Sequence, residues 1–490
     1  MNILLVEPRT PDTFWSMRHA LRFVGKRAAH PPLGLLTVAG FLPRTWRCRL
    51  ADLNVRPLGD RDLQWADYVL TSAMLAQTAS LADIVERSHQ AGKPVIAGGP
   101  AFTGEAANRF DVDHVVVGEV EELAPPLIGD MTAGTLQPLY RSPRFPDLAL
   151  TPLPRWDLVN LRDYASMSVQ WCRGCPFDCE FCDIAALNGR VPRHKSTAQF
   201  LAELDALHAR GWRGMTFVVD DNFVGNRPRC RDLLRAVIQW RRRSGSRMVL
   251  MTEASVDIAN DPELLQLMAE AGFKKVFLGI ETPSLESLRE CRKHQNLRSD
   301  LATAVRTIQT AGIEVIGGFI VGFDNDQPDI FERQFEFIQK TGVATAMVGL
   351  LQAVPRTRLY QRLAGEGRLR GDSTGDNTSA GLNFEPRLDT DFLLRNYRQL
   401  MQRLYEPRTY YRRIQTFLAA HRPRGPRIPY ARSDVAALVR SLWLMGVVHS
   451  GRRAYWSFLT RTLLRQPSRL GVAVTLAITG FHFRQVSAAL

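Results

Sequence analysis

Three cysteines in one short loop have a spacing that suits chemistry at an iron–sulfur cluster. Cys175, Cys179 and Cys182 form a CxxxCxxC array. Three thiolates can bind three irons of a [4Fe-4S] cluster and leave the fourth iron open, whereas clusters that only transfer electrons normally take four cysteines. The spacing therefore predicts a cluster whose open iron binds a substrate or cofactor, and hence an enzyme.

A structural zinc site is the alternative, because Cys172 adds a second CxxC pair to the loop. Only residues 176–178 separate the pair Cys172 and Cys175 from the pair Cys179 and Cys182. Four-cysteine zinc sites usually draw their pairs from points about a dozen or more residues apart. Ligation by Cys172 would also close the open iron. We therefore interpret Cys172 as the end of a strand that leads into the loop, with a redox or repair role as the alternative.

The composition indicates a cytoplasmic globular protein. With 490 residues the chain is long enough for two or three domains. A thiolate-held cluster implies a reducing compartment, and the other cysteines stand singly rather than as a disulfide framework. The chain enters an apolar strand at once, without the basic start of a signal peptide. The longest apolar run, residues 470–481, is too short to span a bilayer.

Two series of alternating strands and helices predict an α/β fold. In residues 1–130 the short apolar runs and helical patterns favour a doubly wound parallel sheet, whose ligands sit beyond the carboxyl ends of the strands. The strands are expected at residues 3–6, 49–52, 68–71, 94–97 and 115–117, and the helices at 33–42, 79–90 and 120–128. The loops 8–32, 72–78 and 98–100 would line the crevice of this sheet.

The second series predicts a partial (β/α)6 barrel with its site at the carboxyl ends of the strands. Five prolines mark residues 131–165 as a linker before the barrel at 166–390, and a mainly helical segment follows at 391–490. The barrel strands are expected at residues 168–171, 215–219, 248–253, 275–280, 314–321 and 346–351.

Polar motifs lie where the barrel strands end. Asp220-Asp221-Asn222-Phe223, Thr252-Glu253 and Glu281-Thr282-Pro283 follow or end successive strands, and glycines surround Ile320. Carboxylates there could bind ribose hydroxyls and an amino group, and the glycines would leave room for an aromatic base. Each motif alone also fits a turn, a cap or a packing glycine. Their joint placement favours a binding site.

The chain resembles the radical S-adenosylmethionine (SAM) superfamily, specifically the class with an N-terminal cobalamin-binding domain. The resemblance spans roughly residues 1–390. It rests on the stretches 173–184, 219–223, 278–283 and 350–355 for the barrel, and on 31–36, 98–100 and 117–119 for the cobalamin domain.

The resemblance implies a set of site residues. Cys175, Cys179 and Cys182 would hold the cluster, and SAM would chelate the open iron. The residues expected to contact SAM are Phe181, Asp220, Asp221, Glu281, Ile320 and Gln352. Those expected to contact cobalamin are Ser72, Gly98, Gly99, Gly118 and Glu119.

The DxHxxG signature that supplies a histidine to cobalt in many cobalamin proteins is missing after the first strand, which runs into Glu7-Pro8-Arg9-Thr10. Members of the class that this chain resembles commonly lack that histidine. His19 and His30 lie in the neighbouring loop. We do not expect either to ligate cobalt, because lone histidines are more often exposed or packing residues.

The expected function is methylation of an unactivated carbon, with cobalamin, SAM and the cluster as cofactors and an external electron donor. The order of domains resembles hopanoid C-2 methylases, which suggests a lipid or other hydrophobic substrate. A non-methylating cyclase or oxidoreductase acting on a tetrapyrrole or secondary metabolite is the alternative. An RNA methylthiotransferase is less expected, because it would need a second cysteine-ligated cluster near the N-terminus, where only Cys48 occurs. A redox sensor would have no use for an open iron.

The segment 391–490 carries the whole excess of positive charge. It contains 17 arginines, no lysine and three acids, which accounts for the formal net charge of +14. Large apolar residues are interspersed with these arginines. The pattern fits three interpretations: a helical subdomain packed on the barrel, peripheral contact with an anionic membrane, or RNA binding. RNA binding is the least expected of the three.

Overall fold

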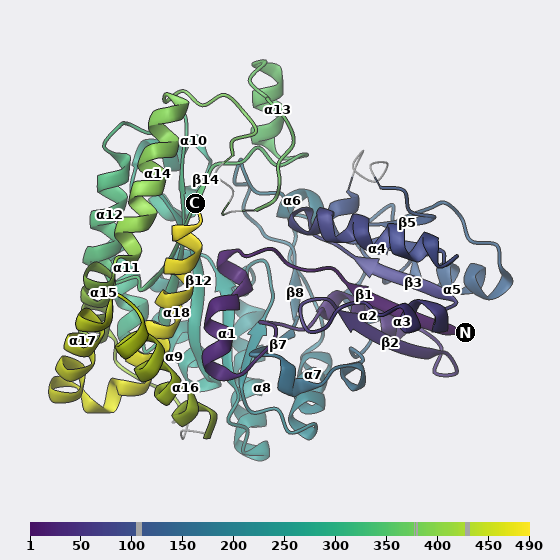
Figure 1. Ribbon diagram of the computed structural model, residues 1–490, viewed down its shortest axis with the longest axis horizontal. Coiled ribbons are helices and arrows are strands. Elements are labelled where there is room, and N and C mark those ends of the chain that lie inside the picture. Colours follow the sequence, from purple (N-terminus) through teal and green to yellow (C-terminus); the bar gives the residue numbers. More distant parts are fainter. Residues whose placement is uncertain (104–109, 377, 379–380, 427–431) are drawn as a thin grey trace.

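Two parallel sheets of six strands organise the protein (Figure 1), and the computed structural model describes residues 1–103, 110–376, 378, 381–426 and 432–490. The N-terminal sheet has the strand order β2-β1-β3-β4-β5-β6. Its first five strands occupy the predicted segments: β1 (Asn2–Glu7), β2 (Arg47–Asp52), β3 (Tyr68–Ser72), β4 (Val95–Gly98) and β5 (His114–Val117). The sixth, β6 (Leu139–Arg141), was not predicted, because only Tyr140 is buried in it and no apolar run marks it. It lies within the segment that we expected to be a linker.

Helices cover both faces of this sheet, as a doubly wound fold requires. α2 (Leu33–Phe41) and α5 (Ala124–Ala133) pack against the face that carries Ile3 and Leu5. α3 (Asp60–Trp65) and α4 (Thr78–Gln90) pack against the opposite face, which carries Leu4 and Val6. Successive residues of β1 thus point to opposite cores, which is why the strand reads as a continuous apolar run.

The second sheet is the predicted partial barrel, with its strands adjacent in chain order. The strands are β7 (Ser166–Val169), β10 (Met215–Val218), β11 (Val249–Ala254), β12 (Phe273–Glu281), β13 (Glu314–Val321) and β14 (Thr345–Leu350). The connecting helices are α7 (Thr197–Ala209), α8 (Arg227–Ser244), α9 (Pro262–Ala271), α10 (Leu285–Glu290), α11 (Leu301–Thr310) and α12 (Ile330–Thr341). Local signals set their ends: in α8, Asn226 accepts a hydrogen bond from the Arg229 amide, and Gly245 ends the helix at φ 62°.

Other segments cover the open edges of the barrel. α14 (Thr390–Tyr405) lies along β14, where the Tyr405 hydroxyl donates to the Ala346 carbonyl at 2.5 Å and the Tyr397 hydroxyl donates to the Val348 carbonyl at 3.1 Å. At the other edge, the Ser166 amide of β7 donates to the Ala29 carbonyl at 2.9 Å. An uncovered strand edge invites pairing with other chains, so this cover protects the barrel.

The C-terminal segment is helical, as predicted. It continues with α15 (Pro407–Ala420), α16 (Arg432–Trp443), α17 (Arg452–Arg465) and α18 (Leu470–Ala488), and in Figure 1 the yellow α18 lies beside the purple α1 (Arg18–Val24). Part of its charge is structural: Arg413 is buried and donates to the carbonyls of Leu404 and Ala344. Within the described residues, no helix combines the length and the apolar character needed to cross a membrane.

Of the N-terminal segment 8–32, which we expected to line the crevice of its own sheet, residues 8–10 lie at the carboxyl ends of that sheet: the Thr10 amide donates to Asn54 at 2.8 Å, and Gln77 donates to the Pro8 carbonyl at 3.0 Å. The 3-10 turn Phe14–Ser16 and α1 of this segment pack against the barrel and α18 instead. The Trp15 ring stacks on Phe217 of β10, with ring centroids 6.2 Å apart and an interplanar angle of 4°. This segment therefore joins the two α/β units and fills part of the barrel.

Candidate active site

The cysteine loop is held at the carboxyl ends of β7 and β10. A two-residue strand, β8 (Cys172–Arg173), pairs with β9 (Arg193–His194) and leads into the loop, which ends at α6 (Ile184–Leu187). Asp220 accepts hydrogen bonds from the amides of Trp171 and Cys172 at 2.8 and 3.0 Å. Asp221 accepts from the Gly174 amide at 2.7 Å. The two carboxylates predicted to contact SAM thus position the cluster loop.

The three cysteines have surroundings that suit thiolate ligands. All are free and partly buried, whereas Cys172 is buried. The Asn222 amide group approaches the Cys175 sulfur at 3.8 Å, and the Gln295 amide group approaches the Cys179 sulfur at 3.6 Å. Burial raises the pKa of Cys175, while hydrogen bonds from the Phe177 amide and Asn222 lower it. Because N–H donors to sulfur are a means of tuning iron–sulfur clusters, the donor set fits a [4Fe-4S] cluster.

A buried ion pair lies beside these cysteines. Lys293 donates to Glu281, the residue predicted to contact SAM, at 2.6 Å. Burial acts to lower the pKa of Lys293, but Glu281 and Cys179 outweigh it and hold that pKa above its usual range. Glu281 has φ 64°, a strained value for a residue other than glycine. Gly279 allows the pair, because a Cβ there would lie 2.2 Å from the Glu281 carboxylate.

Two further predicted SAM contacts lie in one apolar cluster. Phe181 and Ile320 pack against a group that includes Phe323 and Leu351. Gln352 follows β14 and donates to the Gly381 carbonyl at 2.7 Å. These apolar side chains form a wall between the cysteine loop and the last two barrel strands. The roles of these residues toward SAM stay predictions.

Glu253, at the end of β11, is a carboxylate without a hydrogen-bond or ion-pair partner among the described residues. Burial raises its pKa to about 8, with repulsion from Asp221 and Asp220 as the next causes. Asp220 and Asn222 nearby each keep one buried side-chain oxygen without a hydrogen-bond partner among the described residues. The ends of β10 and β11 therefore present hydrogen-bond acceptors that a ligand could use.

A cavity of about 330 Å³ lies beyond the carboxyl ends of β3, β4 and β5. Four residues predicted to contact cobalamin line it: Ser72, Gly98, Gly99 and Gly118. Gly99 has φ 93°, and a Cβ there would lie 2.6 Å from the Ser72 hydroxyl. Gln170, Arg173 and Val219 also line the cavity. The cavity therefore opens between the N-terminal sheet and the cluster loop, where a large cofactor could contact both.

Glu119, the fifth residue predicted to contact cobalamin, is paired with arginines, and its role toward cobalamin stays a prediction. Arg173 of the cluster loop lies 2.6 Å from Glu119, and Arg193 of β9 lies 2.5 Å from it. Arg173 also pairs with Glu121 at 2.8 Å. Burial acts to raise the pKa of Glu121, but Arg173 holds it below its usual range. This network ties the end of the N-terminal sheet to the cluster loop.

Neither histidine of the N-terminal loop lines the cavity. His30 is bonded to the Ser166 hydroxyl at 2.7 Å, and burial lowers its pKa to about 4. His19 packs on His482 of α18, with ring centroids 5.6 Å apart. That neither residue ligates cobalt stays a prediction.

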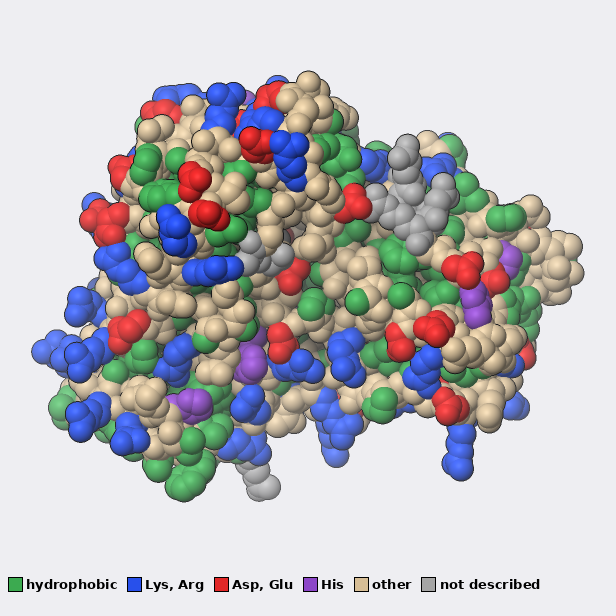
Figure 2. All heavy atoms as spheres, turned by 45° about the horizontal axis from the view of Figure 1, so that its top comes forward, with side chains coloured by type: hydrophobic (Ala, Val, Ile, Leu, Met, Phe, Trp, Pro, Cys, Tyr) green, Lys and Arg blue, Asp and Glu red, His purple; other side chains and the backbone are tan. Residues whose placement is uncertain are grey.

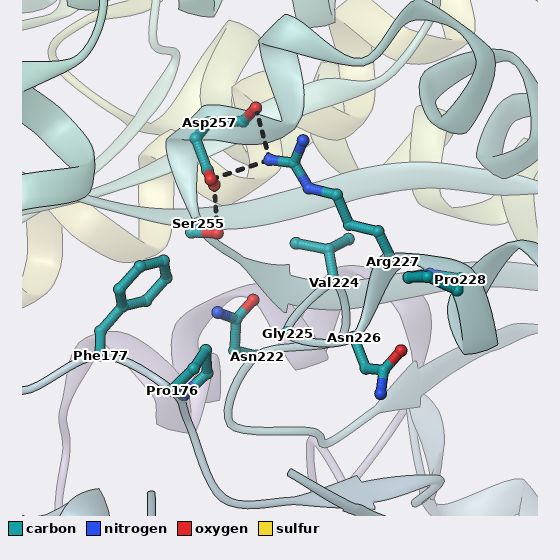
Figure 3. A pocket seen from close by; sticks show the side chains of 10 residues that line it. All are labelled: Pro176, Phe177, Asn222, Val224, Gly225, Asn226, Arg227, Pro228, Ser255 and Asp257. Carbon is teal, nitrogen blue, oxygen red and sulfur yellow. Dashed lines mark hydrogen bonds and ion pairs between the residues drawn. The ribbon is translucent and has the colours of Figure 1, made fainter. Parts of the chain in front are cut away.

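A second pocket, of about 400 Å³, lies on the outer side of the cluster loop. In Figure 3, Pro176, Phe177 and Asn222 face a group formed by Arg227, Ser255 and Asp257. Arg227 donates to the Asp257 carboxylate at 2.8 Å, and the Ser255 hydroxyl donates to it at 2.5 Å. Asn222 therefore lies between this pocket and the Cys175 sulfur.

Several residues of the site were not found from the sequence. Lys293 and Gln295 follow α10, twelve and fourteen positions after Glu281, and no spacing signal links them to the cysteines. Arg173 lies inside the cysteine motif, but the sequence does not show that it pairs with Glu119 and Glu121. The pairing of Arg193 with Glu119 spans 74 residues of sequence. Only the fold brings these residues together.

Comparison with known proteins identifies the class. Residues 169–338 match the model of the radical SAM superfamily, and residues 357–490 match a domain of unknown function, DUF4070. The radical SAM methyltransferase TsrM of Kitasatospora setae, solved with cobalamin and a [4Fe-4S] cluster, superposes with a TM-score of 0.63 at 15% identity, covering 95% of this chain and all of TsrM. The cobalamin-dependent radical enzyme OxsB gives 0.63 at 14% identity, covering all of this chain and 81% of OxsB. The fold is therefore that of cobalamin-dependent radical SAM enzymes.

Full-length relatives narrow this class. An uncharacterized methyltransferase of Synechocystis sp. is 38% identical, with 99% of this chain and 92% of the relative aligned. The hopanoid C-2 methylase of Rhodopseudomonas palustris is 36% identical, with 94% and 89% aligned. The chain belongs to the cobalamin-dependent radical SAM methyltransferases, in the family that includes these two proteins.

Proposed function

We propose that this methyltransferase adds a methyl group to an unactivated carbon of a hydrophobic, lipid-type substrate. The observation that carries the proposal is the cavity beyond β3, β4 and β5, because barrel residues Gln170, Arg173 and Val219 share its lining with Gly98 and Gly99. A cofactor bound there would lie beside the cluster loop. A substrate between the two could exchange a hydrogen atom and a methyl group without release.

Cys175, Cys179 and Cys182 would hold the cluster, and the cavity residues would hold cobalamin. When bound, the cluster with SAM supplies the radical that removes a hydrogen atom, and cobalamin supplies the methyl group. Asp220 and Asp221 position the cysteine loop through its backbone amides. Phe181 and Ile320 belong to an apolar wall that would exclude water from a radical.

The hydrophobic substrate class is supported by the similarity to hopanoid C-2 methylase over most of both chains. An enzyme that methylates a lipid would work at the cytoplasmic face of a membrane, so peripheral membrane contact forms part of the proposal. An external electron donor would reduce the cluster. We do not expect nucleic acid as a substrate.

Product analysis tests the proposed reaction. The protein is reconstituted anaerobically with iron, sulfide and cobalamin, and it is supplied with SAM, reductant and a membrane-lipid extract. Mass spectrometry should detect S-adenosylhomocysteine, 5′-deoxyadenosine and a lipid that has gained one methyl group. Deoxyadenosine without S-adenosylhomocysteine would contradict methylation and favour the cyclase alternative. Methylation of a water-soluble substrate only would contradict the lipid assignment.

Two variants with controls test the cofactor sites. Cys179→Ala should lose the cluster and all activity, whereas Cys48→Ala, at an isolated partly buried cysteine, should keep both. Gly99→Ala should lose cobalamin binding, because its Cβ would lie 2.6 Å from the Ser72 hydroxyl. Gly129→Ala, with open space around its Cβ, is the control. If Gly99→Ala bound cobalamin as well as the unmodified protein does, cobalamin would not bind in this cavity.

A further inference from the structure

The outer side of α16, α17 and the π-helical turn between them (Leu444–Val448) carries exposed apolar side chains that we call the apolar ridge. Their exposed fractions run from 45% at Trp456 to 79% at Leu464. The ridge consists of Val435, Val439, Trp443, Val447, Val448, Trp456, Leu463 and Leu464.

The ridge is a second apolar face on helices that already have a buried one. Val435, Val439, Trp443 and Val447 recur every four residues, so they form one stripe along the helix. Ala437, Ser441 and Met445 are buried on the other side of the same segment. A helix that is apolar all round is normally covered all round. None of the described residues covers the outer stripe.

The ridge continues from α16 to α17. The Trp456 indole N–H donates to the Gly446 carbonyl of the π-helical turn at 2.9 Å. The Trp456 ring packs so closely on Gly446 that a Cβ there would lie 3.1 Å from it. This contact joins the stripe on α16 to Leu463 and Leu464 two turns further along α17. The exposed side chains thus form one surface.

Unpaired positive charge accompanies the ridge. Arg452, Arg453 and Arg465 of α17 are exposed, and none forms an ion pair or side-chain hydrogen bond with any residue in the described ranges. Asp434 is the only acid in the sequence after Glu406. In Figure 2, green apolar side chains lie along the lower left edge of the molecule, with blue basic side chains around them. The surface therefore combines exposed apolar groups with uncompensated positive charge.

We propose that the apolar ridge and these arginines dock the enzyme on the anionic surface of a lipid bilayer. Tryptophan prefers the boundary between head groups and acyl chains, where Trp443 and Trp456 would lie with the valines and leucines. Arg452, Arg453 and Arg465 would bind lipid phosphates. Docking deepens the membrane contact in the proposed function, on which it rests, but it depends neither on the cofactors nor on which carbon is methylated.

Charge and side-chain type favour a bilayer over other occupants. Single-stranded RNA is bound by aromatic rings that stack on bases, and the valines and leucines of the ridge cannot stack. The centre of a protein–protein interface is depleted of charge, whereas this ridge lies beside arginines that have no ion-pair partner among the described residues. An amphipathic surface of Trp, Leu and Val flanked by arginine matches interfacial binding to anionic lipid.

Vesicle co-sedimentation of the full-length protein tests the proposal. The protein should bind vesicles that contain phosphatidylglycerol, bind neutral phosphatidylcholine vesicles much more weakly, and release from the anionic vesicles as salt rises. Arg452→Ser/Arg453→Ser/Arg465→Ser should weaken anionic-vesicle binding by about 10- to 100-fold. Arg44→Ser/Arg47→Ser/Arg61→Ser, which removes three exposed arginines of the N-terminal unit, is the matched control and should bind like the unmodified protein.

A second set of variants tests insertion of the ridge. Trp443→Ser/Leu464→Ser should lose the binding that survives high salt, whereas Leu150→Ser, at another exposed leucine, should not. Brominated lipid should quench less tryptophan fluorescence in Trp443→Ser than in the unmodified protein. All these side chains are exposed, so thermal midpoints should stay nearly constant.

Three results would overturn the proposal. One is absence of binding to anionic vesicles, and another is equal binding by the ridge variants and their controls. The third is a different occupant: a dimer that dissociates in Trp443→Ser/Leu464→Ser, or RNA that binds the same arginines while vesicles do not. Loss of vesicle binding with intact methylation in detergent would separate docking from the reaction.

Discussion

At the carboxyl ends of the barrel strands, some single residues lower the stability of the folded chain but are well placed to contact a ligand. Glu253 is a partly buried carboxylate without a hydrogen-bond or ion-pair partner among the described residues, and Glu281 has a strained backbone. Natural proteins retain such features mainly at functional sites, where a ligand compensates them. The residues that stabilise the site, Asp220 and Asp221, have their hydrogen bonds within the chain. Glu253 therefore offers both carboxylate oxygens to a ligand, whereas Asp220 offers only the one that the loop amides leave unbonded.

The raised pKa of Glu253 predicts a pH-dependent effect on stability. Because its pKa is about 8 in the folded chain and near 4.5 when unfolded, the folded state binds the proton more tightly, and stability falls as pH rises from 4.5 to 8. Glu253→Gln should therefore raise the thermal midpoint at pH 8.5, by about 1–3 °C, and leave it unchanged at pH 4.5. Glu263→Gln, at an exposed surface acid, should show no such trend. Equal thermal midpoints for Glu253→Gln and the unmodified chain at pH 8.5 would show that the Glu253 carboxylate does not destabilise the folded chain.

Lys293 supplies positive charge next to the cysteines. Lys293→Met leaves Glu281 buried without its partner, which should cost about 3 kcal/mol. In the reconstituted protein it should also lower the reduction potential of the cluster, because a nearby cation favours the added electron. Lys293→Arg keeps the charge and should retain most of both properties. Scanning calorimetry and a redox titration followed by electron paramagnetic resonance measure the two effects, and an unchanged potential in Lys293→Met would contradict this role.

At the scale of elements, strands were predictable where burial is continuous. β1 and β13 are buried along nearly their whole length, so their apolar runs mark them within a residue or two. β6 exposes two of its three residues, and β8 and β9 have two residues each, which leaves no period to detect. The same reasoning explains the site. Motif residues follow strand ends and could be found, whereas Lys293 and Arg193 reach the site only through tertiary packing.

The network around Glu119 predicts that two elements depend on each other. Glu119 is 9% exposed and pairs with Arg173 and Arg193, so Glu119→Gln should cost about 3 kcal/mol and loosen the cluster loop. Glu122→Gln breaks only an exposed surface pair with Arg144 and should change stability far less. Thermal midpoints and iron content after gel filtration measure both effects. Retention of iron and stability by Glu119→Gln would mean that the loop is fixed without this network.

At the scale of the whole molecule, the last helix, α18, packs against the N-terminal segment. Phe483 of α18 stacks between Phe14, with ring centroids 5.1 Å apart, and Tyr405, also at 5.1 Å. His482 lies 3.1 Å from the Thr13 carbonyl oxygen. The N-terminal segment is thereby held against the barrel by the last helix. The C-terminal segment is thus packed as one body with the barrel and the N-terminal segment.

Phe483→Ala tests this closure. Loss of a buried phenylalanine should cost about 3–5 kcal/mol, because the cavity removes contacts with both Phe14 and Tyr405. The loss should also release the segment 9–24, so hydrogen exchange there should rise well before exchange in β1 or β4. Leu464→Ala, at a side chain that is 79% exposed, should change neither stability nor exchange. If Phe483→Ala lowers the thermal midpoint without faster exchange in residues 9–24, the last helix stabilises the barrel alone and does not hold the N-terminal segment.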